Sequence, residues 1–582
     1  MKMNSPTSSK TLIFDIETDN LLLDVTVMWV GVTYCIETKE ENIYYDTNDL
    51  VAAINRADCI VGHNIIGYDI PVLNKLSNVC IRDGIGIVDT LILAKLAYYD
   101  KDRSWSHSLD AYGDRLGEPK GDYHDWSKYT KEMEKYCIQD VNVTKKLYQH
   151  LKRKTPWLPQ EALEIEQDVQ KVVTKQYIRG WKFNEKKAME LHIELIQEKE
   201  EAERVLYETF KPSYLPDGKV KVPKRAFRRN GISTVGPHQP IKYTVFNPGS
   251  GNHIVHWVQQ LYGKQTWVLT DKGNPKTDSD TLLDMFKDKE WAQPLLHYLE
   301  VNKLLGQLAE GPKAWMKHIR GERIHGGADI LGAVTGRFTH SNPNLAQVPS
   351  VRAYKGAEAR GLFTVNRGYK LVGADASGLE LRTLSHYLSR YDGGKYSNTV
   401  LEGDIHTANQ TAAGLPTRDM AKTFIYGFLY GAGDAKIGQI TGGGSREGAS
   451  LKKRFLSKTQ GLPELIGDVK KAAKKKYLRG LSGRRLFIRS PHSALNVLLQ
   501  SAGAYYMKYW VVAVDKMIVE QGLDAHIVGN IHDEIQVEVI DSQAEEFARN
   551  LESLFITVGE DIGMRIKMEG EAKIGNNWEQ TH

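Results

Sequence analysis

The chain has 582 residues, of which 26% are charged and 41% are hydrophobic, and its formal net charge is +5. This length suffices for several domains with their own cores, while so weak a net charge does not by itself identify a nucleic-acid-binding protein. No apolar run approaches the roughly 18 residues of a membrane span, and the first ten residues lack the apolar segment of a signal peptide. We therefore expect a cytoplasmic protein without membrane contact. The four cysteines form no C-x-x-C pair and are predicted to be reduced.

Two acidic motifs occur near the start of the chain. Residues 11–18 (TLIFDIET) are predicted to form a buried strand, and the alternation of side chains along a strand places Asp15 and Glu17 on the same face. Residues 61–69 (VGHNIIGYD) are an apolar lead into a polar turn that ends at Asp69. Each motif therefore presents at least one carboxylate at a defined place in the predicted fold.

A third acidic motif lies in a predicted helix, where Tyr136 and Asp140 are one turn apart on the same face. If Asp140 meets the three earlier carboxylates in one cleft, divalent cations relieve their mutual repulsion. A D-x-E pair alone is more typical of a solvated surface. The ordered set D-x-E, H-N-x-x-x-Y-D and Y-x-x-x-D is much more specific, and it predicts a metal-dependent site.

The next segment is predicted to be mainly helical, with one irregular stretch. Residues 161–208 have a helical composition and are predicted to form two long helices, separated by a break at Gly180 and Trp181. Residues 211–251 are rich in proline, which favours a loop over a helix. Because this stretch is also basic, it is interpreted either as a solvated charged loop or as a surface for phosphates or a protein partner. A further helix is predicted over residues 298–315.

Two more carboxylates lie at predicted element ends in the last third of the chain. Residues 369–382 are predicted to form a strand that ends at Asp375 and then turns into a helix, so Asp375 and the carbonyl of Ala376 are candidate metal ligands. Residues 526–538 are predicted to form a β-hairpin with Asp533 near its tip. Either aspartate alone would be typical of a surface turn, whereas the two contexts together predict a second metal site.

Residues 418–433 (RDMAKTFIYGFLYGAG) are predicted to form a helix. Steps of four residues drift by only about 40° around a 3.6-residue helix, so four side chains line one side. These four are Arg418, Lys422, Tyr426 and Tyr430. The two cations suit a triphosphate, because a guanidinium grips oxygens in a fork, and the two rings suit a base and a sugar. The alternative is an ordinary amphipathic helix with solvated cations and buried tyrosines.

This helix resembles the nucleotide-binding helix of the family A DNA polymerases. With the acidic motifs, it is most similar to the replicative polymerases of short-tailed, podovirus-type phages, some of which use host thioredoxin as a processivity factor. The resemblance covers most of the chain and implies an α/β multidomain fold, with an RNase H-like exonuclease domain before a right-hand polymerase domain. The implied domains are an exonuclease at 1–150, a connector and thumb at 151–330 with a proline-rich basic insertion at about 211–250, and palm and fingers at 331–582, with the fingers at about 391–500.

The resemblance also implies the roles of individual residues in the chemistry. In the exonuclease, Tyr136 orients the attacking water, and two Mg²⁺ are bound by Asp15, Glu17, Asp69 and Asp140. In the polymerase, two further Mg²⁺, which Mn²⁺ can replace, are bound by Asp375, Ala376 and Asp533. Lys422 also donates a proton to the pyrophosphate. The incoming nucleotide is contacted by Arg418, Lys422, Tyr426, Tyr430, His406 and Glu380.

Within that nucleotide set, Glu380 and Tyr426 are expected to exclude a ribose 2′-OH, and Tyr430 to stack at the insertion position. The DNA is expected to be contacted by Arg337, Asn496, Gln500 and His532. The first three of these match residues that touch the minor groove, where acceptors are common to every base pair. His532 is expected to meet the primer terminus.

The implied function is template-directed DNA synthesis from dNTPs on a primer–template, with 3′–5′ exonuclease proofreading, in the replication of a phage genome. A single-subunit RNA polymerase would lack the amino-terminal motifs, Glu380 and Tyr426, and a decayed DNA-binding scaffold would not keep every carboxylate. A repair polymerase of the same family would use the same residues. Thioredoxin, another processivity factor and a phage helicase–primase remain open as partners, because thioredoxin-using relatives carry a longer thumb insertion.

Overall fold

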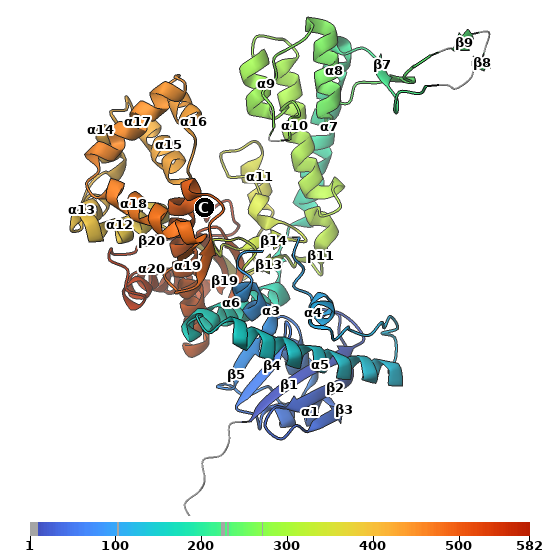
Figure 1. The fold of residues 1–582 in the computed structure, drawn as a ribbon, viewed down its shortest axis with the longest axis vertical. Coiled ribbons are helices and arrows are strands. Elements are labelled where there is room, and N and C mark those ends of the chain that lie inside the picture. Colours follow the sequence, from blue (N-terminus) through green and yellow to red (C-terminus); the bar gives the residue numbers. More distant parts are fainter. Residues whose placement is uncertain (1–9, 102–103, 223–226, 230–231, 235, 271) are drawn as a thin grey trace, which may run out of the picture. The chain divides into compact units, whose positions relative to one another are not determined.

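The computed structural model describes residues 10–101, 104–222, 227–229, 232–234, 236–270 and 272–582 (Figure 1). Contacts divide the chain into two compact units. The first comprises Met1–Lys182, Arg323–Gln347 and Phe363–His582, and the second comprises Phe183–Glu322 and Val348–Leu362. This division is coarser than the three domains expected from the sequence, because the amino-terminal region and the last third of the chain share one unit. The three-domain division remains a prediction.

The amino-terminal region of the first unit is built around a mixed five-stranded sheet of order β3-β2-β1-β4-β5. Its strands are β1 (Thr11–Thr18), β2 (Met28–Cys35), β3 (Glu41–Tyr44), β4 (Cys59–Gly62) and β5 (Gly86–Asp89). Its helices are α1 (Thr47–Ile54), α2 (Asp69–Leu76), α3 (Thr90–Ala97), α4 (Leu109–Leu116) and α5 (Lys131–Lys154). The strand β1 runs antiparallel to β2 and parallel to β4. The predicted strand at residues 11–18 is therefore confirmed, and the sheet agrees with the predicted RNase H-like domain.

The two faces of β1 have different surroundings because side chains alternate along a strand. Ile13 belongs to a small apolar cluster with Met133, Cys137 and Val141 of α5. Leu12 and the other side chains on the opposite face belong to the large core that also contains residues of α1 and α3. Helix α5 thus covers one face of the sheet. It is the same face that carries the acidic side chains of β1.

The region predicted to form the palm contains a four-stranded antiparallel sheet of order β18-β19-β15-β20, called the palm sheet below. Its strands are β15 (Tyr369–Ala376), β18 (Ala525–Ile531), β19 (Glu534–Ile540) and β20 (Gly570–Gly575). Helices with residues in its core are α12 (Leu379–Asp392), α19 (Ala494–Glu520) and α20 (Ala544–Asp561). The predicted strand ending near Asp375 and the predicted hairpin at 526–538 are both confirmed. The hairpin tip is tight, since His532 adopts a φ of 58°.

A second apolar core in the same unit holds together a set of mostly short helices. These are α13 (Lys395–Glu402), α14 (Ile405–Ala413), α15 (Arg418–Leu429), α16 (Asp434–Gln439), α17 (Ser445–Lys458) and α18 (Leu462–Ala472), followed by the hairpin β16 (Tyr477–Arg479) and β17 (Arg485–Phe487). Thr417 caps α15 by accepting a hydrogen bond from the Met420 N–H. The helix predicted over 418–433 is shorter than expected, because the chain leaves the helix at Tyr430 and reaches a positive φ of 75° at Gly431.

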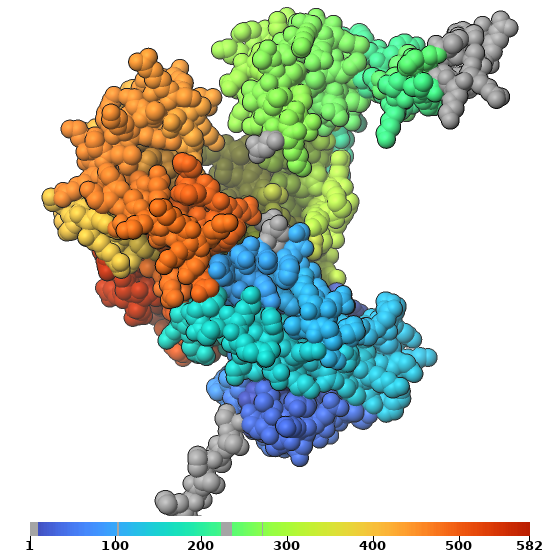
Figure 2. All heavy atoms as spheres, in the orientation of Figure 1, coloured from blue at the N-terminus to red at the C-terminus, as the bar shows by residue number. Residues whose placement is uncertain are grey.

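A buried ion triad connects the two regions of the first unit. Glu166 lies on α6 (Gln160–Arg179), Lys508 lies on α19, and Arg484 precedes β17; all three are at least 93% buried. The Glu166 carboxylate accepts hydrogen bonds from both cations, at 3.2 Å from Arg484 Nη1. Nearby, the Arg485 guanidinium lies 4.3 Å from the ring centroid of Trp157. In Figure 2 the cyan and teal atoms of this region abut the orange atoms.

Replacing Glu166 by glutamine is expected to destabilise the protein by about 3–5 kcal/mol, because two buried cations then lose their shared carboxylate. The midpoint of urea unfolding, followed by intrinsic tryptophan fluorescence, measures the loss. Glu164→Gln, on the exposed side of the same helix, is the matched control and should leave the midpoint within error. Equal midpoints for the two variants would show that the triad contributes nothing to stability.

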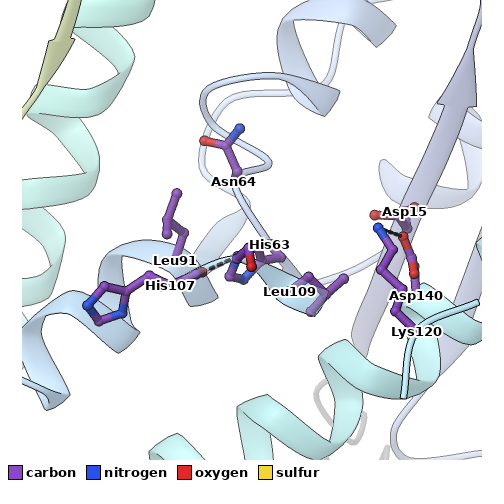
Figure 3. A pocket seen from close by; sticks show the side chains of 9 residues that line it. Asp15, His63, Asn64, Leu91, His107, Leu109, Lys120 and Asp140 are labelled. Carbon is purple, nitrogen blue, oxygen red and sulfur yellow. Dashed lines mark hydrogen bonds and ion pairs between the residues drawn. The ribbon is translucent and has the colours of Figure 1, made fainter. Parts of the chain in front are cut away.

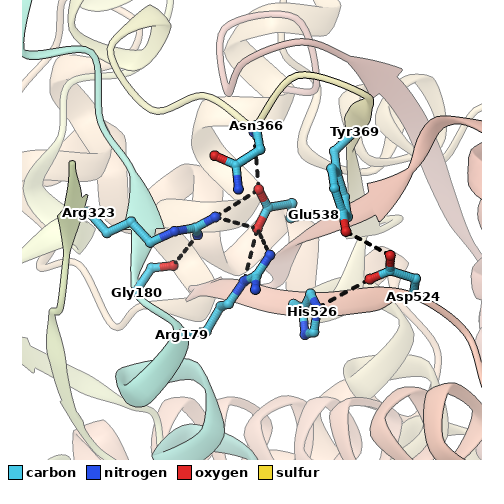
Figure 4. A network of polar contacts seen from close by, with 8 residues as sticks. All are labelled: Arg179, Gly180, Arg323, Asn366, Tyr369, Asp524, His526 and Glu538. Atoms are coloured by element: carbon cyan, nitrogen blue, oxygen red, sulfur yellow. Dashed lines mark hydrogen bonds and ion pairs between the residues drawn. The ribbon is translucent and has the colours of Figure 1, made fainter. Parts of the chain in front are cut away.

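A second polar cluster connects three segments to the palm sheet (Figure 4). Glu538 of β19 is 1% exposed, and its carboxylate accepts hydrogen bonds from Arg179 (2.7 Å), Arg323 (2.9 Å) and the Asn366 N–H (3.1 Å). Arg323 also donates to the Gly180 carbonyl at 2.9 Å. Because charge-assisted bonds of this kind are short and directional, the cluster fixes the end of α6 against the sheet.

The second unit is a helical body with an aromatic core. Its α-helices over residues 183–322 are α7 (Glu185–Thr209), α8 (Gly251–Tyr262), α9 (Ser279–Phe286) and α10 (Ala292–Leu305). The core includes Phe210, Trp257 and Trp291, with Phe210 and Trp291 in edge-to-face contact at 5.2 Å. The two long helices predicted over residues 161–208 are confirmed as α6 and α7.

Two sequence predictions for the second unit are wrong in part. The proline-rich segment contains four short strands rather than loop alone: β7 (Ser213–Pro216), β8 (Phe227–Arg229), β9 (Ile232–Thr234) and β10 (Ile241–Thr244). They pair as β7 with β10 and β8 with β9, and such pairing tolerates proline at sheet edges. The helix predicted over 298–315 begins earlier, and its α-helical part ends at Leu305 before one π-helical turn (Gly306–Glu310).

Among the described residues, none of the helices is long and apolar enough to cross a membrane. The four cysteines are free thiols.

Candidate active sites

The amino-terminal carboxylates meet where β1, α2 and α5 come together. Asp15 and Glu17 project from β1, Asp69 is the first residue of α2, and Asp140 lies in the middle of α5. Ligand atoms of Asp15, Glu17 and Cys137 lie within 4.8 Å of one another. Cys137 was not singled out from the sequence, although its place three residues before Asp140 and next to Tyr136 puts it at this site.

Burial and mutual repulsion raise the pKa values of these carboxyls. Burial is the main cause in each case, and it raises the pKa of Glu17 to about 9, that of Asp69 to about 7 and that of Asp140 to about 6. The pKa of Asp15 is also raised well above its usual range, by burial and then by the charge of Asp140. One oxygen of Glu17 and one of Asp140 are buried without a hydrogen-bond partner among the described residues. The group therefore fits divalent cations, which prefer carboxylate oxygens.

The double variant Asp15→Asn with Glu17→Gln is expected to be more stable than the wild type in metal-free buffer above about pH 7. The folded-state pKa values are about 9 for Glu17 and about 7 for Asp69, whereas the unfolded values are about 4. Below about pH 4 these carboxyls are protonated in both states, so the folded wild type has its full stability there. This stability is lost as the pH rises through about 6 to 9.

Thermal unfolding with EDTA between pH 4.5 and 9 tests this expectation. The difference in Tm between variant and wild type should grow with pH, and added Mg²⁺ should raise the Tm of the wild type alone. A difference that is constant over this range would contradict the coupling of the carboxylates.

A cavity of about 510 Å³ opens beside these carboxylates (Figure 3). Its nine lining residues include Asp15, Asp140, Lys120, His63 and Asn64. His63 bridges the Thr90 hydroxyl (2.9 Å) and the His107 carbonyl (3.0 Å). Asn64 has a φ of 64°, a conformation that asparagine tolerates better than most residues.

Tyr136 lies one turn before Asp140 on α5, as the sequence predicted. The ammonium of Lys120 is 4.6 Å from its ring centroid and 2.6 Å from Asp140 Oδ2. Lys120 had no signal in the sequence, because it lies in an irregular segment between α4 and α5.

The second pair of carboxylates lies where β15 ends and where the chain turns from β18 into β19. Asp375 is the penultimate residue of β15, and Asp533 is in the two-residue turn between β18 and β19. The Ala376 N–H donates to the Asp533 carbonyl at 3.1 Å, which fixes the two segments to each other. Burial and the charge of Asp533 raise the pKa of Asp375 to about 7, and burial raises the pKa of Asp533 to about 6. The two aspartates predicted from separate motifs therefore share one site.

Three further predicted residues are linked to these aspartates. Arg337 Nη2 lies 3.2 Å from Glu380 Oε1 and 3.6 Å from Asp533 Oδ1. The Tyr430 hydroxyl donates to the same Glu380 oxygen at 2.6 Å. Glu380 is thus hydrogen-bonded to Tyr430, although the sequence analysis paired it with Tyr426. The ring of Tyr426 lies near that of Tyr430, with centroids 6.5 Å apart and planes at 25°.

The predicted cations of α15 lie at its amino-terminal end. Arg418 is engaged by Asp404, with Nε 2.7 Å from Oδ2, and Lys422 is exposed one turn further along. Asp404 is the N-cap of α14 and was not identified from the sequence. The His406 ring lies 6.4 Å from the Tyr426 ring, and its buried Nδ1 has no hydrogen-bond partner among the described residues. The described geometry therefore joins α14 and α15 in one cationic and aromatic surface.

The remaining predicted DNA contacts lie on α19 and in the palm hairpin. Asn496 and Gln500 are one turn apart near the start of α19, and Asn496 Nδ2 donates weakly to the Tyr430 carbonyl at 3.5 Å. His532 is exposed at the hairpin tip, next to Asp533. Asn496 is therefore close to Tyr430, which is bonded to Glu380, and His532 is next to Asp533 in the chain.

Trp578 and His582, near the carboxyl terminus, also reach this site, and the sequence did not indicate these contacts. Glu534 accepts a hydrogen bond from Trp578 Nε1 at 2.6 Å, and His582 Nδ1 lies 2.8 Å from its other oxygen. Glu534 raises the pKa of Asp375, after burial and Asp533. The contacts join residues 44 and 48 positions apart, so local sequence patterns carry no signal for them.

Comparisons with known proteins agree with this arrangement. The family described as DNA polymerase family A matches residues 237–580. The DNA-directed DNA polymerases of Enterobacteria phage T3 and Escherichia phage T7 are each 35% identical to this chain, over 98% of this chain and 100% of the relative. DNA polymerase I of Aquifex aeolicus is 30% identical over 58% of this chain and 59% of its own length.

Among solved structures, the chain is similar to the POL domain of Pol1 from M. smegmatis in complex with DNA primer-template and dNTP. The TM-score is 0.77, the sequence identity is 19%, and the match covers 98% of this chain and 96% of that one. At 19% identity, this structural similarity establishes the fold alone. The family match and the two full-length phage relatives show more: this chain is a member of DNA polymerase family A.

Proposed function

We propose that this family A polymerase is a proofreading replicase, in which template-directed DNA synthesis and 3′–5′ hydrolysis use separate carboxylate centres. Family membership supplies DNA-directed DNA polymerase activity. The observation that carries the second activity is the amino-terminal cluster, where four desolvated carboxyls have raised pKa values and where Glu17 and Asp140 each have one unsatisfied oxygen. Base selection by binding alone has limited resolution, so a second hydrolytic site improves accuracy.

In DNA synthesis, Asp375, Asp533 and the carbonyl of Ala376 would hold two Mg²⁺. When bound, these ions, or Mn²⁺ in their place, would activate the primer 3′-OH and neutralise the triphosphate and the leaving pyrophosphate. Phosphoryl transfer depends mainly on positioning and charge neutralisation. The backbone bond between Ala376 and Asp533 supports this role, since it keeps the two carboxylates in a fixed relation.

The surface of α14 and α15 is proposed to bind the incoming dNTP. Arg418 and Lys422 would bind phosphate oxygens, His406 would add a further contact, and Lys422 would protonate the pyrophosphate. Tyr426 would lie beside the sugar, and with Glu380 it would exclude a ribose 2′-OH. Tyr430 would stack at the insertion position. Since Asp404 pairs with Arg418 through Nε, it would hold the guanidinium in place while the other N–H groups bind phosphate.

Primer–template DNA is proposed to lie across the palm hairpin and the start of α19. Arg337, Asn496 and Gln500 would donate to minor-groove acceptors, which every base pair presents. His532 would contact the primer terminus. The ion pairs of Arg337 with Glu380 and Asp533 hold this guanidinium next to the reacting centre, so it can monitor the shape of the newest base pair.

In proofreading, Asp15, Glu17, Asp69 and Asp140 would hold two Mg²⁺, and Tyr136 would orient the attacking water. The partners of the whole enzyme are primer–template DNA and dNTPs, in the cytoplasm of the host of a phage. The segment at about 211–250 is proposed to contact DNA or to dock thioredoxin or another processivity factor, with a phage helicase–primase as a further partner. Extension of a long template with and without thioredoxin distinguishes docking from DNA contact.

The proposal as a whole is tested with a labelled primer–template in Mg²⁺. With all four dNTPs the wild type should copy the template, and with only the dNTP complementary to the first template base it should stop there. Without dNTPs it should remove a mismatched 3′ nucleotide faster than a matched one. Extension without any trimming would reject the proofreading half of the proposal and leave the polymerase half intact.

A further inference from the structure

Lys120 is a cation placed inside the exonuclease centre. Its Nζ lies 2.6 Å from Asp140 Oδ2, and its side chain is 19% exposed. It also lies over the ring of Tyr136, at 4.6 Å from the centroid. Figure 3 shows Lys120, Asp15 and Asp140 together at one side of the cavity. The ammonium thus contacts Asp140 and Tyr136, two residues with proposed roles in the hydrolysis.

The segment that precedes Lys120 is held in place by several contacts. Gly117 ends α4 in the left-handed conformation, with φ of 66°, and the Glu118 N–H donates to the Gly113 carbonyl. Gln139 of α5 donates to the Pro119 carbonyl at 2.9 Å. Lys146 of α5 lies 3.3 Å from the Glu118 carboxylate. The backbone on the amino-terminal side of Lys120 is therefore fastened to the same helix that supplies Tyr136 and Asp140.

Charge makes this cation useful to the reaction. Among the nine described residues that line the cavity, Lys120 carries the one permanent positive charge. Burial lowers the pKa values of His63 and His107 to about 4, so both rings are neutral near pH 7. A phosphodiester anion that enters the cavity is repelled by four carboxylates at short range, and a nearby ammonium offsets part of this repulsion.

We propose that Lys120 is a further catalytic residue of the exonuclease, whose ammonium binds a non-bridging oxygen of the 3′-terminal phosphodiester of DNA. Asp140 holds this ammonium in the cavity before the strand enters. In the reaction, the water oxygen forms a bond to phosphorus and releases one proton to solvent. The bond from phosphorus to the 3′ oxygen of the preceding nucleotide breaks, and that oxygen takes up one proton from solvent. Lys120 stays protonated throughout. The assignment rests on the proposed exonuclease function.

Lys120→Met should slow single-turnover trimming of a mismatched primer on the order of 100-fold, as expected for the loss of one charged stabiliser of a phosphoryl transition state. Lys120→Arg should keep most of the rate because it keeps the charge. Lys128→Met removes an exposed lysine from the same domain and should behave as the wild type. Primer extension should be unchanged in all three variants.

A binding measurement separates contact with phosphate from a structural role. The probe is a primer–template with three terminal mismatches and 2-aminopurine at the primer 3′ end, titrated in EDTA, where no hydrolysis occurs. The 3′-terminal linkage is either a phosphodiester or a methylphosphonate, which lacks one charged oxygen. In the wild type the methylphosphonate should bind about tenfold more weakly, and in Lys120→Met the two linkages should bind alike.

The wild-type comparison uses the intact protein, so it remains informative if Lys120→Met folds poorly. Equal affinity of the wild type for both linkages would overturn the assignment. It would also be overturned if Lys120→Met weakened the binding of both linkages by the same factor relative to the wild type. A wild type that does not trim at all would instead reject the exonuclease function on which the assignment rests.

Discussion

Asp375→Asn is expected to reduce primer extension on the order of 1,000-fold or more while mismatch trimming continues at the wild-type rate. The aspartate is one of the two carboxylates proposed to bind the cations that neutralise the transferring phosphate, and an amide cannot supply its negative charge. The amide keeps the shape of the side chain at the end of β15, so the fold should persist. Single-nucleotide extension under single-turnover conditions measures the effect.

Glu545→Gln is the matched control for this variant. It removes one carboxylate from the exposed first turn of α20, in the same unit, and should extend primers normally. If Asp375→Asn still extends primers at a rate within tenfold of the wild-type rate, Asp375 does not belong to the polymerase active site. If it loses trimming as well, the substitution has disturbed the fold and not only one site.

Asp15→Ala combined with Glu17→Ala should have the opposite effect. Trimming of a mismatched primer should fall on the order of 1,000-fold or more, because two of the four carboxylates at the junction of β1, α2 and α5 are removed. Extension of a matched primer should be unchanged, and errors in a copied reporter sequence should rise. Neither residue contributes to the palm sheet, so the synthetic centre stays intact.

An exposed acidic pair in the same domain provides the control: Glu40→Ala with Glu41→Ala removes the same charge from the beginning of β3. This control should trim normally. Persistent trimming in the Asp15 and Glu17 variant would move the hydrolytic activity to another site, and reduced extension would show that the two regions are coupled.

Local patterns were sufficient to predict the elements that carry the carboxylates. The strand over Thr11–Thr18 has the predicted bounds. Its apolar residues and its two acids can be assigned to faces directly from the alternation of side chains along a strand. The palm strand and hairpin were found in the same way, from apolar runs that end in acidic turns. The end of α15 was not found, since the departure at Tyr430 depends on the left-handed Gly431.

Contacts between distant residues could not be predicted. Lys120 reaches Asp140 from an irregular segment, and His582 reaches Glu534 across 48 positions. The pairing of Arg418 with Asp404 is also invisible to helical periodicity, because Asp404 lies on another helix. The proline-rich segment was interpreted as loop because proline disfavours helix, but strands at a sheet edge satisfy the same restriction. The contacts of Lys120, His582 and Asp404 could therefore be found only from the fold, because no local motif indicates them.

The ion triad has a consequence for the preparation of shorter fragments. The contact-based boundary at Lys182 would suggest that a polymerase fragment can start there, and the expected exonuclease boundary at residue 150 would suggest an earlier start. A fragment beginning after α6 would leave Lys508 and Arg484 buried without the Glu166 carboxylate, a state that is strongly unfavourable. A fragment that begins before Trp157 keeps both Glu166 and the ring under Arg485. We therefore expect the shortest fragment that folds and synthesises DNA to include helix α6, although this helix precedes the first polymerase motif by more than 150 residues.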